Sequence, residues 1–118
     1  MMSQRQGSLL PPAEAKAERA ALEQAWLALT RDALPAMAAS RRWPVRFDHC
    51  FQRILLDDAF QGRWYDHVEG RPAYRHVPDD RLAHAVLRGR QVLAGELDLH
   101  EMNRASLRWR GKEGPKGV

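Results

Sequence analysis

The sequence predicts an all-α fold, a compact single-domain bundle of about four main helices. Apolar residues recur at helical spacing in four successive segments, and no strand-like alternation of useful length appears. The length of 118 residues suits one domain. We place the helical domain at residues 11–110, between a disordered N-terminus at 1–10 and a frayed basic tail at 111–118.

The first helix is expected to begin at Pro11 and Pro12, because proline is tolerated in the first turn of a helix. The segment that follows is rich in alanine, leucine and glutamate, all strong helix formers. Pro35 should end or kink this helix, with residues 36–40 able to add one turn. Pro44 then favours a non-helical connector.

The second main helix, from about Phe47 to Phe60, is apolar on several sides. Its broad apolar face consists of Phe47, Cys50, Phe51, Ile54 and Leu55, and Leu56, Ala59 and Phe60 lie on other sides. A helix of this kind is usually buried between partners. The pattern therefore predicts a place at the centre of the bundle.

A structured polar loop is expected at residues 61–76, which glycine and proline interrupt. Pro78 opens the third main helix. Gly89 lies in the core stripe of that helix, where it would allow close approach of another helix. Gly95 is the expected C-cap, and the last helix is expected from about Leu97 to Trp109.

Composition excludes several classes of protein. The single cysteine, Cys50, rules out an intramolecular disulfide framework. No apolar run approaches the ~20 residues of a membrane span, and no signal-peptide pattern is visible. We therefore expect a soluble, cytoplasmic protein without a membrane partner. The net charge of +4 is carried by residues 102–118, whose basic side chains are mostly arginine.

Asp58 is the most unusual residue of the second helix, because it falls near the middle of the apolar face. Burial of an unpaired carboxylate is very costly, so we expect a partner, either Arg53, Arg46 or a donor from the loop. A purely structural bond to a backbone amide, a tryptophan N–H or an arginine of a neighbouring helix is the alternative.

His49, Arg53 and Asp57 flank Asp58 at a spacing of i, i+4 and i+8, which sets them roughly in a row. We expect them to line one cavity with aromatic residues of the loop. The ligand-binding candidates in the loop are Trp64, Tyr65, His67, Tyr74 and His76.

The favoured interpretation is a pocket that binds, or acts on, a small polar or anionic molecule. Arg53 would clamp the charge, His49 would serve as acid or base, and Asp57 or Asp58 would orient the ligand. The sequence identifies neither a reaction nor a cofactor.

Two other kinds of site are open in the same region. Cys50 could act as a nucleophile with His67 or His76 as base, although a cysteine on an apolar face is most often a core residue. Asp48, His49, Asp66, His67 or His76 could supply metal ligands, but no H-x-x-x-H or C-x-x-C spacing occurs. We therefore predict no metal site.

The basic C-terminal helix supports another class of function. Arg104, Arg108, Arg110 and Lys112 could contact the phosphates of a nucleic acid, with the interleaved Trp109 stacking on a base. No helix-turn-helix or zinc-finger pattern is visible. The alanine-rich first helix could instead pack on a protein partner or on a second copy of the chain.

The stretches RFDHCFQRILLD, WYDHVEGRPAYRH and NRASLRWRGK resemble small uncharacterised bacterial proteins over about residues 43–112. Some of these are described as GNAT-type acetyltransferases, so the resemblance implies acetyl transfer as a minor alternative. The motif of that family, R/Q-x-x-G-x-G/A, is nearly matched at Gln4–Gly7 and Arg108–Gly111. The final positions are Leu9 and Glu113, and neither stretch follows a predicted strand.

Overall fold

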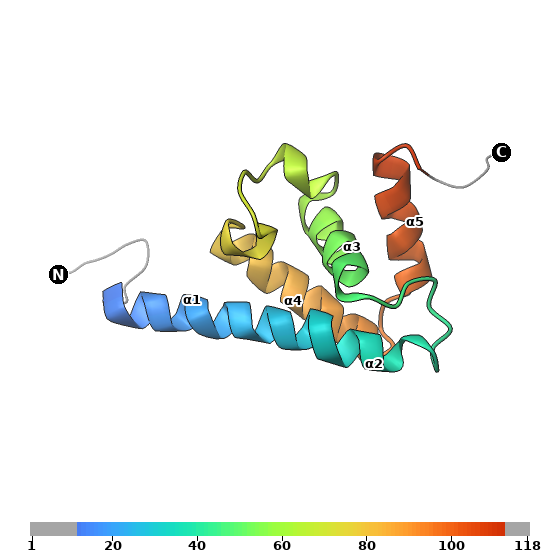
Figure 1. Cartoon of the computed structure of the whole chain (residues 1–118), viewed down its shortest axis with the longest axis horizontal. Coiled ribbons are helices and arrows are strands. Elements are labelled where there is room, and N and C mark those ends of the chain that lie inside the picture. The colour runs from blue at the N-terminus through green and yellow to red at the C-terminus, as the bar shows by residue number, and fades with distance from the viewer. Residues whose placement is uncertain (1–11, 113–118) are drawn as a thin grey trace.

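A computed structural model describes residues 12–112 as four main helices, with one long loop between the second and the third (Figure 1). The elements are α1 (Pro12–Leu27), η1 (Ala28–Ala33), α2 (Leu34–Ala38), α3 (Asp48–Phe60), η2 (Trp64–Asp66), η3 (Ala73–Arg75), α4 (Asp79–Leu93) and α5 (Leu99–Trp109). These residues contain no strand, which confirms the all-α fold. The expectations for residues 1–11 and 113–118 lie outside the described residues. Within 12–112, no helix is long and apolar enough to cross a membrane.

The first main helix continues through Pro35 to Ala38, so this proline does not end the helix, and residues 36–38 add the further turn that was allowed for. α1, η1 and α2 follow one another without a break, and η1 is a π-helical turn (Figure 1). Proline cannot donate the hydrogen bond of a regular helix interior, but it is tolerated at the start of a helical segment. Pro35 occupies that position in α2, directly after the wider π-turn.

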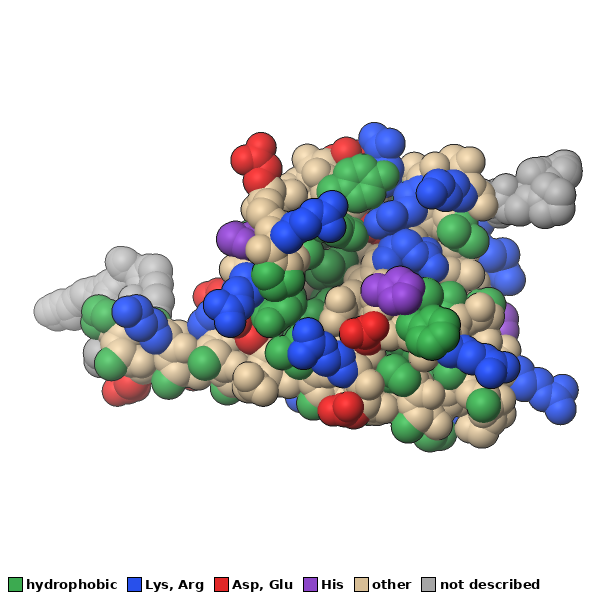
Figure 2. Space-filling view, in the orientation of Figure 1, with side chains coloured by type: hydrophobic (Ala, Val, Ile, Leu, Met, Phe, Trp, Pro, Cys, Tyr) green, Lys and Arg blue, Asp and Glu red, His purple; other side chains and the backbone are tan. Residues whose placement is uncertain are grey.

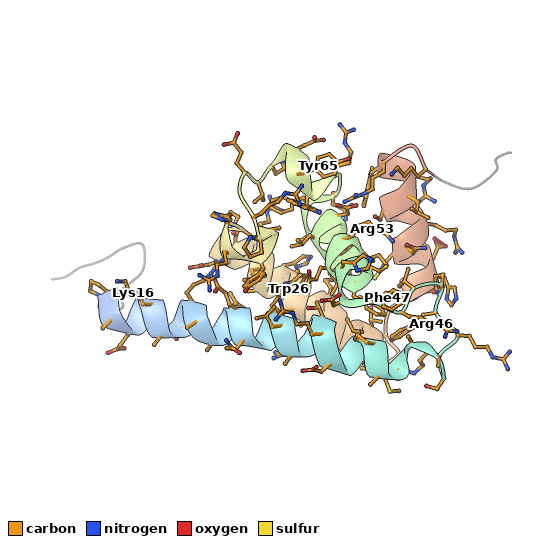
Figure 3. All side chains as sticks on the ribbon, in the orientation of Figure 1. Lys16, Trp26, Arg46, Phe47, Arg53 and Tyr65 are labelled. Carbon is orange, nitrogen blue, oxygen red and sulfur yellow. The ribbon has the colours of Figure 1, made fainter. Side chains whose placement is uncertain are left out.

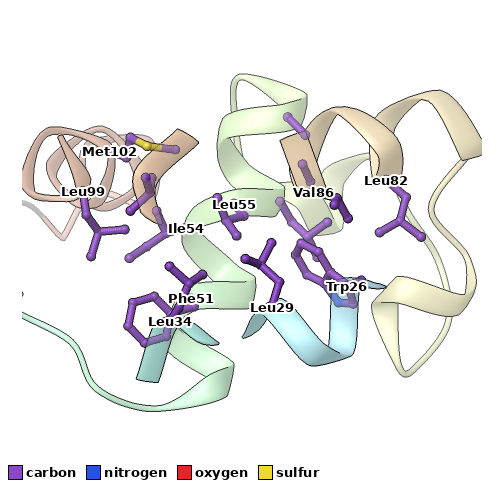
Figure 4. Close-up of a cluster of buried hydrophobic side chains, with 14 of the residues drawn as sticks. Trp26, Leu29, Leu34, Phe51, Ile54, Leu55, Leu82, Val86, Leu99 and Met102 are labelled. Carbon is purple, nitrogen blue, oxygen red and sulfur yellow. The ribbon is translucent and has the colours of Figure 1, made fainter. Parts of the chain in front are cut away.

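The hydrophobic core surrounds α3, as its apolar sides predict. Phe51, Ile54 and Leu55 are fully buried there. Figure 4 shows them among side chains of the three other main helices, including Trp26, Leu29, Leu34, Leu82, Val86, Leu99 and Met102. The exception is Phe47, which was expected on the buried face and is 65% exposed. Its backbone is extended, because it is the N-cap of α3, and its ring stacks on His49.

Gly89 allows the first main helix to lie close to α4, as its place in the core stripe predicts. A Cβ atom at Gly89 would collide with the side chain of Leu29 and would stand 3.0 Å from Leu55. Glycine is therefore favoured at this position because there is no room for a side chain, and not because of its backbone angles.

Two side chains fix the ends of α4 and α5. Arg41 donates from Nη2 to the carbonyl of Leu93 at the end of α4, at 2.8 Å. Asp98 is the N-cap of α5 and accepts from the backbone N–H of His100 at 2.9 Å. This cap explains why α5 begins at Leu99, two residues after the expected start.

Candidate functional site

A cavity of ≈ 570 Å³ lies beside α3, within the range of roughly 300–1,000 Å³ that is typical of small-molecule sites. Its lining residues are Trp26, Arg31, His49, Gln52, Arg53, Leu56, Trp64, Arg71, Pro72, Ala73, Tyr74 and Arg110. The face in Figure 2 is hollowed, with hydrophobic side chains deep in the hollow and blue arginine side chains around it. The lining thus includes four arginines and no aspartate or glutamate.

The loop between α3 and α4 is held in place by bonds at both of its helical turns. The backbone N–H of Trp64 donates to Oδ1 of Asp57 at 3.0 Å. Arg19 of α1 donates from Nη2 to the carbonyl of Tyr74 at 2.8 Å. These bonds tie the loop to α3 and to α1, so Trp64 and Tyr74 form fixed aromatic walls of the cavity.

Arg53 projects from α3 towards α5 and lines the cavity (Figure 3). It donates from Nη1 to Oγ of Ser106 at 2.8 Å and from Nη2 to Oδ1 of Asn103 at 2.9 Å. Both acceptors are neutral, and Arg53 forms no ion pair with a carboxylate among residues 12–112. Burial lowers the pKa of Arg53, and the nearby positive charge of Arg110 lowers this pKa further, whereas the charge of Asp57 opposes the shift. Arg53 therefore shares the carboxylate of Asp57 with Arg110 and has no carboxylate partner of its own in the described chain.

Arg110 has the opposite arrangement, because a buried carboxylate balances it. Asp57 is fully buried and accepts from Nε of Arg110 at 2.7 Å and from Nη2 at 3.1 Å. It also accepts from the hydroxyl of Ser106 at 2.6 Å. The same Ser106 oxygen accepts from Arg53, so one hydroxyl connects the two arginines. Asp57 therefore neutralises Arg110 and fixes its position at the cavity wall.

The remaining two arginines lie near the surface. Arg31 is half exposed and stands 3.9 Å from a carboxylate oxygen of Asp48. The guanidinium of Arg71 lies 6.0 Å from the centre of the Trp64 ring. The four arginines of the lining are thus opposed by two carboxylates within residues 12–112: Asp57, which lies near both Arg110 and Arg53, and Asp48, whose exposed contact offsets only part of the charge of Arg31. The cavity therefore presents a positive potential suited to an anion.

Trp26 of the first helix and Gln52 of α3 also border the cavity. Trp26 is fully buried, and its indole Nε1 has no hydrogen-bond partner among the described residues. Gln52 donates from Nε2 to Oγ1 of Thr30 at 3.0 Å, and Thr30 donates to the carbonyl of Trp26 at 2.9 Å. Buried donors are rarely left without a partner, so the free indole N–H is unusual.

The structure brings four of the predicted site residues to this cavity, namely His49, Arg53, Trp64 and Tyr74. His49 stands at the rim, with its side chain 77% exposed. The expected row of His49, Arg53 and Asp57 does not face the cavity in full, because Asp57 lies behind the wall against Arg110.

Asp58 lies away from this cavity. It is 8% exposed, as expected, but its partner is neither Arg53 nor Arg46. Arg88 of α4 donates to it from Nε at 2.9 Å and from Nη2 at 3.1 Å, and these bonds raise the pKa of Arg88. This arrangement matches the structural alternative, an arginine of a neighbouring helix.

Tyr65, His67 and His76 also lie outside the cavity lining. The guanidinium of Arg110 lies over the ring of Tyr65, 5.1 Å from the ring centre. Figure 3 places Tyr65 at the outer end of the loop. His67 stacks on Phe60, with the ring centres 5.0 Å apart. His76 packs against Gly70. These three residues support the loop rather than line the cavity.

The same region was also considered for a Cys50 nucleophile and for a metal site. Cys50 is partly buried, and neither His67 nor His76 forms a hydrogen bond with it among the described residues. No group of three or more histidine, cysteine, aspartate or glutamate side chains within 12–112 could hold a metal ion.

The four basic residues predicted to contact a nucleic acid do not all face the solvent. Arg104, Arg108 and Lys112 are exposed, and Arg104 stands 3.3 Å from Glu101. Arg110 turns inward to Asp57 instead, with its side chain only 16% exposed. An α5 surface for nucleic acid would therefore lack Arg110.

Four residues of the cavity lining were not predicted from the sequence, namely Trp26, Arg31, Gln52 and Arg71. Arg110 was predicted to lie on a nucleic-acid surface instead. Trp26 and Arg31 lie on the first helix, and no local pattern shows that they face the loop. A weak signal was present at Gln52, a polar residue one position before Arg53 on the most apolar helix.

Comparison of the chain with protein-family models, curated proteins and solved structures gives no match. The function is therefore inferred from the chemistry of the cavity itself. The stretch Arg108–Gly111 begins in the last turn of α5 and ends just after it, so it does not follow the strand that the acetyltransferase motif requires.

Proposed function

We propose that this protein binds a small anionic molecule in the cavity beside α3, with the charge of the ligand held by arginines and its apolar part by Trp64 and Tyr74. The observation that carries the proposal is the state of Arg53. This cation lines the cavity, its hydrogen-bond acceptors are neutral, and a second arginine stands nearby. An anion in the cavity would balance the excess of four lining arginines over the two carboxylates beside them.

The geometry also favours an organic anion over a bare inorganic ion. The aromatic walls and Leu56 give the cavity apolar surface that a hydrated ion would leave uncovered. Arginine forks bind carboxylates and phosphates through paired, charge-assisted hydrogen bonds. A flat molecule with an acidic group would therefore contact the aromatic side chains with its ring and the arginines with its acidic group.

Isothermal titration calorimetry with phenyl phosphate, benzoate and the neutral benzamide tests the proposal. The two anions should bind, and benzamide should bind at least about 10-fold more weakly, because it lacks the charge-assisted bonds. Equal affinity for benzamide and benzoate, or binding of none of the three, would contradict the proposal.

Arg31→Gln is the diagnostic variant, because Arg31 is half exposed and its loss should not disturb folding. It should weaken the binding of phenyl phosphate by about 3- to 10-fold. Arg104→Gln is the matched control, since Arg104 is also about half exposed but lies outside the cavity lining. An equal effect of the two variants would indicate general charge attraction rather than a site.

Nucleic-acid binding by α5 is the second candidate, supported by the exposed Arg104, Arg108 and Lys112. Oligonucleotide affinity should then fall steeply with salt, as expected when phosphates release counterions. It should also fall when Arg104 is replaced by glutamine, whereas Arg31→Gln should have no more than a small effect. A salt-independent affinity, or no binding, rejects this candidate.

A further inference from the structure

The orientation of the Gln52 amide is fixed by its neighbour Thr30. Thr30 has one hydroxyl proton, which it donates to the backbone carbonyl of Trp26. The hydroxyl oxygen can then only accept, so the NH₂ group of Gln52 faces it. Oε1 of Gln52 is therefore left as a hydrogen-bond acceptor without a partner among residues 12–112.

Oε1 of Gln52 is also accessible from the cavity. The one buried side-chain nitrogen or oxygen atom without a partner in residues 12–112 belongs to Trp26, so Oε1, which also lacks a partner, retains accessible surface. One helical stripe of α3 lines the cavity, and it consists of His49, Gln52, Arg53 and Leu56. Gln52 lies inside this stripe, and its NH₂ group is held by the buried Thr30. The accessible surface of Oε1 therefore faces the cavity.

Gln52 supplies an acceptor in a wall whose charged side chains can only donate. The four arginines of the lining have no acceptor atom. His49 stands at the rim, and the hydroxyl of Tyr74 interacts with Arg75. An anion that fills the cavity without a donor of its own would remove water from Oε1 and leave it unpaired, which is unfavourable. A ligand with a donor that reaches Gln52 avoids this loss.

The acceptor and the neighbouring arginine of α3 are directed to different helices. Gln52 is bonded to Thr30 of the first main helix, whereas Arg53 is bonded to Ser106 and Asn103 of α5 (Figure 3). A ligand that contacts both must therefore carry its acidic group and its donor at separate positions. The donor must also be neutral, because the four arginines repel an ammonium group.

We propose that the ligand is an aromatic acid with a neutral hydrogen-bond donor, a hydroxyl or an aromatic amine, on a ring position away from the acidic group. This inference rests on the proposed function. The acidic group contacts the arginines, the ring lies against Trp64 and Tyr74, and the donor binds Oε1 of Gln52. Gln52 then decides which aromatic acids bind, because it favours those that carry the donor.

Calorimetric titration with substituted benzoates tests the inference on the unaltered protein. The meta or para isomer of hydroxybenzoate or aminobenzoate should bind about 10-fold more tightly than benzoate. It should exceed by the same factor the fluorobenzoate of the same ring position, which has a similar size but no donor. The ortho isomer of hydroxybenzoate should show no such gain, because its hydroxyl donates to its own carboxylate. The para isomer of aminomethylbenzoate, an ammonium ion at neutral pH, should bind more weakly than benzoate.

Gln52→Met keeps the length of the side chain and removes the acceptor. It should reduce the preference for the donor-bearing benzoate over benzoate from about 10-fold to less than about 2-fold, with the affinity for benzoate itself nearly unchanged. Gln24→Met, an exposed position on α1 outside the cavity lining, is the matched control and should leave the preference intact. Should Gln52→Met fail to fold, the comparison with the fluorobenzoates decides alone.

The outcomes separate this inference from the proposed function. If benzoate or phenyl phosphate binds in an Arg31-dependent manner but no donor-bearing benzoate binds more tightly than benzoate and its fluorobenzoate, the inference is wrong and the anion site stands. A preference that Gln52→Met leaves unchanged also overturns the inference. If none of these anions binds, both are wrong.

Discussion

Arg53 and Arg110 line the same cavity, yet their removal should affect stability very differently. Arg110→Met would leave the carboxylate of Asp57 fully buried without its cation. Removal of one partner of a buried ion pair costs about 3–5 kcal/mol. The remaining bonds from Ser106 and Trp64 place the expected loss at the lower end, about 3 kcal/mol.

Arg53→Met leaves no buried charge behind. The two hydrogen bonds to Ser106 and Asn103 and the attraction to Asp57 are lost, but the desolvation of the guanidinium and its repulsion with Arg110 are lost as well. Because these effects oppose one another, the free energy of unfolding should change by less than about 1.5 kcal/mol. Anion affinity should nevertheless fall by about 10-fold or more, since an arginine that would bind the anion is gone.

Urea denaturation followed by circular dichroism measures both losses, with Asp66→Asn as an exposed carboxylate control that should not shift the midpoint measurably. A loss for Arg53→Met as large as that for Arg110→Met would show that Arg53 is balanced within the fold and has no need of a ligand.

Three further expectations concern the rest of the molecule. Gly89→Ala should reduce the free energy of unfolding by about 1–3 kcal/mol, because the added methyl group collides with Leu29; an unchanged urea midpoint would contradict the close approach. Asp58→Asn should destabilise the fold by about 2 kcal/mol through the loss of its ion pair with Arg88, but calorimetry should show unchanged phenyl phosphate affinity. In a His49→Gln background, which removes the one histidine of the cavity lining, phenyl phosphate affinity should rise about 3- to 10-fold from pH 5 to 7.5 as the phosphate becomes a dianion, whereas benzenesulfonate affinity should stay constant.

The main helices could be predicted because their signals are local. The periodicity of apolar residues, Pro78 before α4 and Gly95 after it all mark boundaries that the structure retains to within two residues. The need for Gly89 could be predicted for the same reason, since its place in the core stripe is a property of one helix. The continuation of the first helix through Pro35 could not be predicted, because it depends on a π-helical turn for which the sequence gives no signal.

The partners of the polar residues could not be predicted, because they are set by the packing of distant elements. Asp57 and Arg110 are separated by 53 positions, and Asp58 and Arg88 by 30. The helical row of His49, Arg53 and Asp57 correctly indicated a polar strip on α3, but α5 covers one end of it. Which residues face a cavity was therefore decided by where α5 and the loop lie.

The most direct measurement of the central claim is the response of the four tryptophan indole N–H signals in a ¹H–¹⁵N NMR titration with phenyl phosphate. Trp26 and Trp64 line the cavity, whereas Trp43 and Trp109 do not. If the anion binds in the cavity, the Trp26 and Trp64 signals should shift saturably, with Trp43 and Trp109 unaffected. Shifts confined to Trp109, or no shift at any of the four, would contradict it.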